Sequence, residues 1–285
     1  MYISLGLGPI GAQAPLATAI EYAKRYQFGG LDINIQEVAD LVDEKGADAV
    51  KAMFAEANIV PGCWGMPVNT RGDESTWQEG LAALPRLAKA GQAIGALRVS
   101  TFIMPGHNEL DYQANFDFHT ERLRPIAQIL ADHNLRFGLE WVGTKTLRES
   151  FKYPFLYTME EAIKLGEAIG TPNMGLLVDI YHVENSGATA EDVRRLTNEQ
   201  VVYAHVNDGV AGVPADERHD TTRDLPGYTG ELDLRAFLQA LNTINYDGPV
   251  TCEPFSQRLR DLPDEDAIAE VSAAMHKGWR AAGLS

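Results

Sequence analysis

A chain of 285 residues, 45% of them hydrophobic, can form a large core, which excludes global disorder. The formal net charge of −16 argues against nucleic acid and against an anionic membrane surface as partners. No apolar stretch approaches the ~20 residues of a membrane helix, and residues 1–11 lack the basic and long apolar segments of a signal peptide. We therefore expect a soluble, cytoplasmic protein. The sequence leaves open whether it forms a homo-oligomer.

Apolar runs with strand character alternate with amphipathic helical segments along the whole chain. Such an alternation at this length predicts an α/β fold, a (β/α)8 TIM barrel, with residues 1–285 as a single domain. The eight strand candidates begin near Ile3, Gly30, Ile59, Leu97, Leu135, Met174, Val201 and Pro249.

Several local patterns mark the helices and the buried positions. Thr158 and Glu161 form a capping-box pattern before a helix that begins near Met159. Asp233 is expected to cap a later helix. Cysteines 63 and 252 lie inside apolar runs, so we expect buried side chains rather than a disulfide or a nucleophile. The last helix carries one apolar stripe, made of Ile268, Val271, Met275 and Trp279.

The alternative architecture is a doubly wound open sheet, which usually carries a glycine-rich phosphate turn after an early strand. Residues 6–11, GLGPIG, approach that pattern, but they include a proline, and no helix with a ribose-binding acid follows cleanly. The loops after the seventh and eighth predicted strands also lack the glycine-rich helix start that holds phosphate in many barrels. Together with the acidic charge, this favours an uncharged sugar over a sugar phosphate as substrate.

Four side chains with metal-binding chemistry lie at the ends of predicted strands. Catalytic groups of a barrel lie at the C-terminal strand ends, so these four should converge. Three carboxylates and an imidazole in one place repel each other or are costly to desolvate unless a divalent cation holds them together. A structural ion-pair network is the alternative. The residues are Glu140, Asp179, His205 and Glu253, in the runs LRFGLE, MGLLVD, VVYAHV and PVTCEP.

The ligand types indicate which metal would bind. One imidazole and three carboxylates suit a hard or borderline cation, so we expect one divalent ion, with Mn²⁺ preferred and Mg²⁺, Co²⁺ or Zn²⁺ as alternatives.

Further residues are predicted to lie at the barrel mouth. His182 is predicted to contact the substrate, with a second metal ligand or a loop cap as alternatives. His107, in the turn after the fourth strand, is a weaker candidate, with a solvated loop histidine as the alternative. Trp64, Trp141 and Phe255 could each stack on the apolar face of a sugar, and ordinary core packing is the equal alternative.

Several segments resemble the xylose-isomerase-like TIM barrels, specifically the sugar phosphate isomerase/epimerase group that includes ketose 3-epimerases, hydroxypyruvate isomerases and inosose dehydratases. The resemblance covers most of the chain and is best from Phe137 to Phe255. It is carried by FGLEW, VDIYH, YAHVND, LPGYTGELDL and NYDGPVTCEPF.

The resemblance implies roles for individual residues. The four strand-end residues would be the metal ligands, Glu140 and Glu253 would also transfer protons, and His182 would contact substrate oxygens. Ketose 3-epimerases also carry a substrate-binding arginine in the loop after strand seven. Arg218 and Arg223 both lie in that loop with shifted spacing. Arg218 is included in the predicted substrate-binding set, with Arg223 as the alternative.

A metal between two carboxylates indicates α-proton abstraction. A divalent ion on a ketone oxygen and a neighbouring hydroxyl acidifies the carbon between them and stabilises an enediolate. We therefore predict a metal-dependent isomerase or epimerase of a free ketose or keto-sugar. The first alternative is a dehydratase or lyase acting on a keto-sugar, keto-glycoside or inosose. An abasic-site endonuclease is disfavoured by the −16 charge and the seven histidines, and a non-catalytic barrel is disfavoured by the four strand-end ligands.

Overall fold

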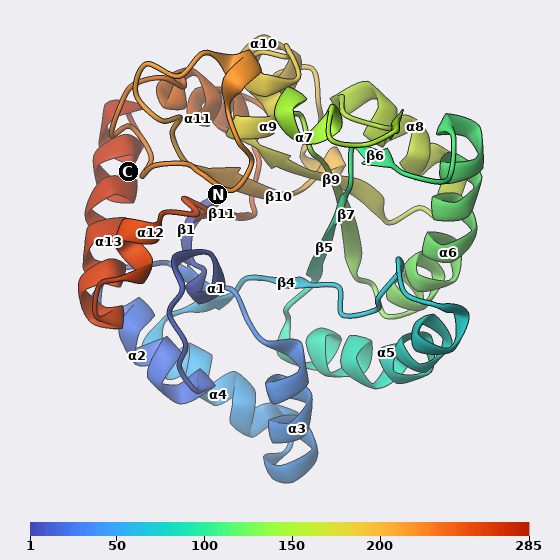
Figure 1. Ribbon diagram of the computed structural model, residues 1–285. Coiled ribbons are helices and arrows are strands. Elements are labelled where there is room, and N and C mark those ends of the chain that lie inside the picture. The colour runs from blue at the N-terminus through green and yellow to red at the C-terminus, as the bar shows by residue number, and fades with distance from the viewer. Residues whose placement is uncertain (285) are drawn as a thin grey trace.

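The computed structural model describes residues 1–284 and shows the strands arranged as a barrel inside a ring of helices (Figure 1). The sequence prediction of a TIM barrel is therefore confirmed. The barrel strands are β1 (Tyr2–Leu5), β2 (Gly30–Leu31), β3 (Val60–Pro61), β4 (Cys63–Gly65), β5 (Arg98–Ile103), β7 (Arg136–Trp141), β9 (Met174–Asp179), β10 (Val201–Val206) and β11 (Pro249–Cys252).

Neighbouring strands pair in parallel in the order β3-β2-β1-β11-β10-β9-β7-β5-β4. The first and last of these, β3 and β4, are separated in sequence only by Gly62, whose N–H donates to the carbonyl of Leu31. They are two parts of one interrupted strand, which pairs with β2 through its first part and with β5 through its second. The barrel thus has the eight strand positions that the sequence predicts.

Helices surround the barrel in Figure 1. The longer helices are α2 (Leu16–Arg25), α3 (Ile35–Lys45), α4 (Ala47–Ala57), α5 (Glu74–Ile94), α6 (Tyr112–Asp132), α8 (Met159–Ile169), α11 (Leu234–Thr243) and α13 (Asp264–Ala281). The short elements are α1 (Leu7–Ile10), α7 (Lys145–Arg148), α9 (Ile180–Asn185), α10 (Ala190–Val193), α12 (Gln257–Arg260), the 3-10 turns η1 (Asn198–Gln200) and η2 (Ala215–Glu217), and the antiparallel pair β6 (Gly106–His107) and β8 (Tyr153–Pro154).

The predicted helix signals are confirmed. Thr158 and Glu161 form a reciprocal capping box at the start of α8, and the Asp233 carboxylate accepts from the N–H of Ala236 at the start of α11. The predicted stripe of α13 is buried. Both cysteines are buried and unpaired. Within residues 1–284, no helix is long and apolar enough to cross a membrane.

The long polar segment between β10 and α11 is folded around one buried carboxylate. The Asp208 side chain accepts hydrogen bonds from the N–H groups of Thr229, Gly230 and Leu232, at 3.0, 2.7 and 3.0 Å. The backbone of Asp208 also pairs with that of Asp224. These contacts fix the path of a loop that follows the strand carrying His205.

We expect Gly62→Ala to lower the free energy of unfolding by about 1–3 kcal/mol, the usual cost of overpacking. A methyl group there would stand 2.8 Å from Ser4 Oγ and also overlap the Asp32 carboxylate. Gly65→Ala is the matched control, because its methyl group meets no heavy atom within 4 Å. Urea denaturation of both variants tests this. Equal stability of the two variants would contradict the steric role of Gly62.

Candidate metal centre and active site

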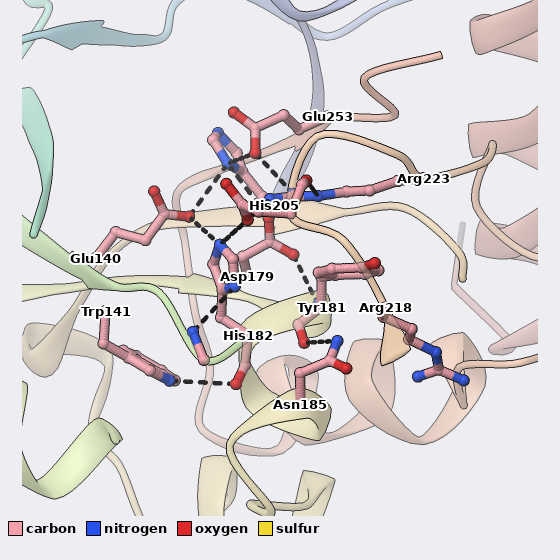
Figure 2. Close-up of polar contacts among 12 residues, drawn as sticks. Glu140, Trp141, Asp179, Tyr181, His182, Asn185, His205, Arg218, Arg223 and Glu253 are labelled. Atoms are coloured by element: carbon pink, nitrogen blue, oxygen red, sulfur yellow. Dashed lines mark hydrogen bonds and ion pairs between the residues drawn. The ribbon is translucent and has the colours of Figure 1, made fainter. Parts of the chain in front are cut away.

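The four strand-end residues converge at one end of the barrel. Glu140 lies in β7, Asp179 ends β9, His205 lies in β10 and Glu253 directly follows β11. One side-chain ligand atom from each lies within 4.8 Å of every other. Figure 2 shows the four side chains pointing toward one another. The structure therefore brings together the side chains that the sequence singles out as metal ligands.

Strand register explains part of this convergence. Asp179 and His205 are direct partners in the pairing of β9 with β10, and Thr251 is the partner of His205 on the other side, in β11. Paired residues of parallel strands project from the same face of the sheet. Asp179 and His205 therefore point together into the barrel.

The distances within the cluster leave room for one small ion. His205 Nδ1 lies 3.4 Å from Glu253 Oε2, 3.8 Å from Asp179 Oδ2 and 3.9 Å from Glu140 Oε1. Glu140 Oε1 and His205 Nδ1 are buried and have no hydrogen-bond partner. Buried polar atoms are normally satisfied, so two such atoms facing one point indicate a missing partner. The donor set fits a single divalent cation.

Arg223 is the cation that the structure places beside this cluster. Its Nη1 donates to Asp179 Oδ2 at 2.6 Å and to Glu253 Oε2 at 2.8 Å. Its Nη2 donates to Asp220 Oδ1 at 2.9 Å. Tyr181 and Phe255 lie against the guanidinium, with ring centroids 4.6 and 4.8 Å away. The side chain is 1% exposed, so its charge is held in place by carboxylates and aromatic rings together.

The two glutamates have different electrostatic surroundings. Burial, followed by repulsion from Glu253, raises the pKa of Glu140 well above its ordinary value. Burial alone would also raise the pKa of Glu253, but His205 and Arg223 outweigh it and hold that pKa below its ordinary value. One carboxyl group therefore favours the protonated form, and the other favours the ionised form.

The two histidines also differ. Burial alone would lower the pKa of His205, but the carboxylates of Glu253, Glu140 and Asp179 raise it to about 9. Burial, together with the charge of Arg223, lowers the pKa of His182 to about 3, so its imidazole is neutral. A proton on His205 competes with a metal ion for the same nitrogen.

The predicted substrate-binding residues occupy several different places. His182 lies at the cluster, with Nε2 3.2 Å from Arg223 Nη2 and 3.8 Å from Glu140 Oε1. Arg218 lies outside it and donates to Glu231 and to the carbonyl of Val213. Figure 2 shows the side chains of Arg218 and Arg223 in these separate positions. Arg223, which the sequence offers as the alternative to Arg218, is thus the arginine that contacts the metal ligands.

The aromatic and loop candidates contact other groups than the four predicted ligands. Trp141 is fully buried and donates from its indole N–H to the carbonyl of His182, so it supports that histidine. Trp64 is 2% exposed and donates to the carbonyl of Ala96. His107 lies in β6 and accepts backbone N–H bonds from residues 109 and 110. A direct sugar contact by these three residues stays a prediction.

Sequence reasoning missed two residues at the cluster. The Asn207 amide donates to both oxygens of Asp179, at 3.0 and 3.3 Å. Asp220 receives the hydrogen bond from Arg223 and lies 3.5 Å from His182 Nε2. Asn207 comes two residues after His205 in the YAHVND segment, which was an available signal. Asp220 lies in an irregular loop, where spacing gives no such signal.

A polar network inside the barrel supports His205. The Asp32 carboxylate accepts hydrogen bonds from Ser4 and Thr251, at 2.8 and 2.7 Å, and from the Tyr203 hydroxyl. The Tyr203 ring stands edge-on to the imidazole of His205, with centroids 4.5 Å apart. Asp32 therefore fixes the ring that packs against a predicted metal ligand. The sequence analysis did not identify this carboxylate.

The chain belongs to the Xylose isomerase-like TIM barrel family, whose model matches residues 20–277. Among solved structures, a xylose isomerase domain protein from Alicyclobacillus acidocaldarius subsp. acidocaldarius is similar over 99% of both chains, with 29% sequence identity and a TM-score of 0.85.

Curated relatives of this chain are named as isomerases and epimerases. The inosose isomerase of Bacillus velezensis is 27% identical over 52% of this chain, and the match spans only 50% of that relative's length. The inosose isomerase of Halalkalibacterium halodurans is 21% identical over 89% of this chain and 87% of its own. The ketose 3-epimerase of Arthrobacter globiformis is 30% identical over 47% of this chain and 40% of its own.

We expect Mn²⁺ to stabilise the protein by about 2.7 kcal/mol when free metal is at 100 times its Kd. The ion relieves repulsion among three carboxylates, and Asp179→Asn should remove most of this effect. Asp247→Asn is the control, because its carboxylate pairs with Arg98 and does not belong to the cluster. Thermal unfolding with Mn²⁺ and with EDTA measures both variants. An undiminished Mn²⁺ effect in Asp179→Asn would refute the site.

We expect Tyr203→Phe to weaken Mn²⁺ binding by about tenfold or more, as loss of groups that support metal ligands does. The substitution keeps the ring but removes its bond to Asp32, which frees the ring against His205. Tyr246→Phe is the control, because it also removes a buried hydroxyl, one that donates to the carbonyl of Pro249. Calorimetric titration with Mn²⁺ compares the two. Equal Mn²⁺ affinities would show that the Tyr203 hydroxyl has only a structural role.

Proposed function

We propose that the protein is a divalent-metal-dependent isomerase or epimerase of an uncharged ketose or keto-sugar, in which Glu140 and Glu253 transfer the proton. The observation that carries this is the convergence of three carboxylates and one imidazole at one end of the barrel, with Glu140 and Glu253 among them. The opposite directions of the pKa shifts of these two glutamates agree with one acid and one base.

The proton-transfer roles rest on the contacts of each glutamate. Glu253 is kept ionised beside Arg223 and is suited to take a proton from the carbon next to a carbonyl. Glu140 has no basic partner at hydrogen-bond distance among the described residues and is suited to hold a proton and deliver it. The two approach from β7 and β11, which are separated in the barrel by β9 and β10. They would therefore flank a bound substrate.

The metal and the remaining residues would orient the substrate. Glu140, Asp179, His205 and Glu253 would hold the ion, and when bound it supplies Lewis-acid polarisation of the carbonyl. Mn²⁺ is the proposed ion, on the chemistry of the donor set. The neutral imidazole of His182 would hydrogen-bond a substrate oxygen beside the cluster. The names of the relatives, inosose isomerases and a ketose 3-epimerase, support the reaction class.

Charge at the centre favours an uncharged substrate. Arg223 is already engaged by the carboxylates of Asp179, Glu253 and Asp220. With Glu140 protonated, a divalent ion and Arg223 balance the three ionised carboxylates, so the centre offers no spare positive charge. A phosphate or carboxylate on the substrate would find no free cation there. The metabolism of neutral sugars in the cytoplasm is the proposed setting.

Exchange of solvent deuterium into ketoses tests the reaction. In D2O with Mn²⁺, we expect deuterium at the carbon between carbonyl and hydroxyl, with an epimer or isomer as product. Glu140→Gln and Glu253→Gln should each lower the rate by about 100-fold or more, since an acid or base contributes about 10²–10⁴. Glu184→Gln, a carboxyl outside the cluster, should leave the rate unchanged.

The outcomes separate the candidates. Release of water or of an aglycone during the reaction would identify a dehydratase or lyase instead. Full turnover by Glu253→Gln would refute its proton-transfer role. Calorimetry with Mn²⁺ on each glutamine variant distinguishes a lost proton transfer from a lost metal.

A further inference from the structure

A cavity of about 840 Å³ lies beside the metal cluster, between β4 and the segments that follow β1 and β2. Ser100 and Tyr203 belong to its lining, and Tyr203 is the ring that stands edge-on to His205. None of the four predicted metal ligands lines it. Tyr203 is therefore the residue that links the cavity lining to the metal cluster.

The size of this cavity exceeds what the reaction itself needs. If the proposed function is right, the reacting carbons lie between Glu140 and Glu253, outside the cavity. The whole cavity is therefore free of these carbons. Its volume of about 840 Å³ lies in the range of about 300–1,000 Å³ that complete small-molecule sites occupy. A substrate that is held at the metal thus has room for a further ring-sized group.

The lining indicates the chemistry of that group. Leu7, Pro9 and Leu16 supply apolar surface, and Gln13 and Asn34 add polar groups near the rim. Apolar surface with a few placed polar groups is typical of a site for a small organic ligand, and a sugar ring has one apolar face and several hydroxyls.

Charge in the lining excludes some ligands. The charged residues there are Asp32 and Glu37, both acidic, and no Lys, Arg or His within residues 1–284 lines the cavity. A phosphate or carboxylate group would find no cation there, and its burial would be costly.

We propose that this cavity binds a second, uncharged ring of the substrate, so that the enzyme acts on a keto-glycoside or a similarly substituted keto-sugar rather than on a free monosaccharide. This inference rests on the proposed function of the metal centre. In this proposal, residues after the first barrel strands select the size and charge of the substrate. Residues at the ends of the later strands transfer the proton.

Gly65, at the end of β4, gives direct access to the cavity for a test. It belongs to the lining, and a Cβ atom there would meet no heavy atom within 4 Å. Gly65→Leu should therefore fill part of the cavity without disturbing the fold, whereas Gly65→Ala should leave it open. Gly8 has the same two properties, so Gly8→Leu is an independent second variant.

The experiment compares three probes in D2O with Mn²⁺: D-fructose, the ketose disaccharide lactulose, and D-fructose 6-phosphate. For the unmodified protein, we expect kcat/KM of deuterium exchange to be about tenfold or more higher for lactulose than for D-fructose, and the phosphate to be a poor substrate. Gly65→Leu should lower kcat/KM for lactulose about tenfold or more and change that for D-fructose less than about twofold. Gly65→Ala should behave like the unmodified protein.

Each contrary outcome has a definite meaning. If lactulose has no advantage, or if both leucine variants lower exchange of both sugars equally, the cavity does not bind a second ring. Preference for the phosphate would refute the charge argument. If Mn²⁺ binds but no probe exchanges deuterium, the proposed function fails, whatever the cavity holds. Melting curves of the leucine variants confirm that each is folded before these rates are compared.

Discussion

Repulsion among buried carboxylates is the constraint on which this site depends. Glu140, Asp179 and Glu253 lie within one small volume, and Asp220 lies at its edge. Bringing these groups out of water is costly, and their like charges raise the cost. Arg223 offsets part of it, because its guanidinium contacts three of the four carboxylates. It forms no ion pair with Glu140, where burial and then repulsion from Glu253 raise the pKa.

Hydrogen bonds inside the barrel hold the ring that packs against a predicted metal ligand. Asp32 joins Ser4 of β1, Tyr203 of β10 and Thr251 of β11 by hydrogen bonds, so one carboxylate ties three strands together. A buried polar network of this kind favours a single arrangement only when all its members are satisfied. The Tyr203 ring of this network packs against His205 and so holds the imidazole in position before any ion binds. Gly62 serves the same network, since a larger residue would overlap Asp32.

Features with a local periodic pattern can be predicted from this sequence, whereas contacts that depend on loop geometry cannot. The strands, the capping box at Thr158 and the convergence of the four strand-end ligands all result from local patterns and from the rule for barrel strand ends. The choice between Arg218 and Arg223 does not follow from a local pattern. It depends on how the loop after β10 folds around the Asp208 carboxylate. The burial of Trp141 also depends on tertiary packing, which apolar character alone does not specify.

The proposed proton transfer and the proposed binding of a second ring use different parts of the chain. The four cluster residues lie between positions 140 and 253, whereas most of the cavity lining lies between positions 6 and 65. The two regions meet at Tyr203, which contacts His205 and lines the cavity. Substitutions in the early loops can therefore change the size and charge of the group that is accepted without moving a metal ligand.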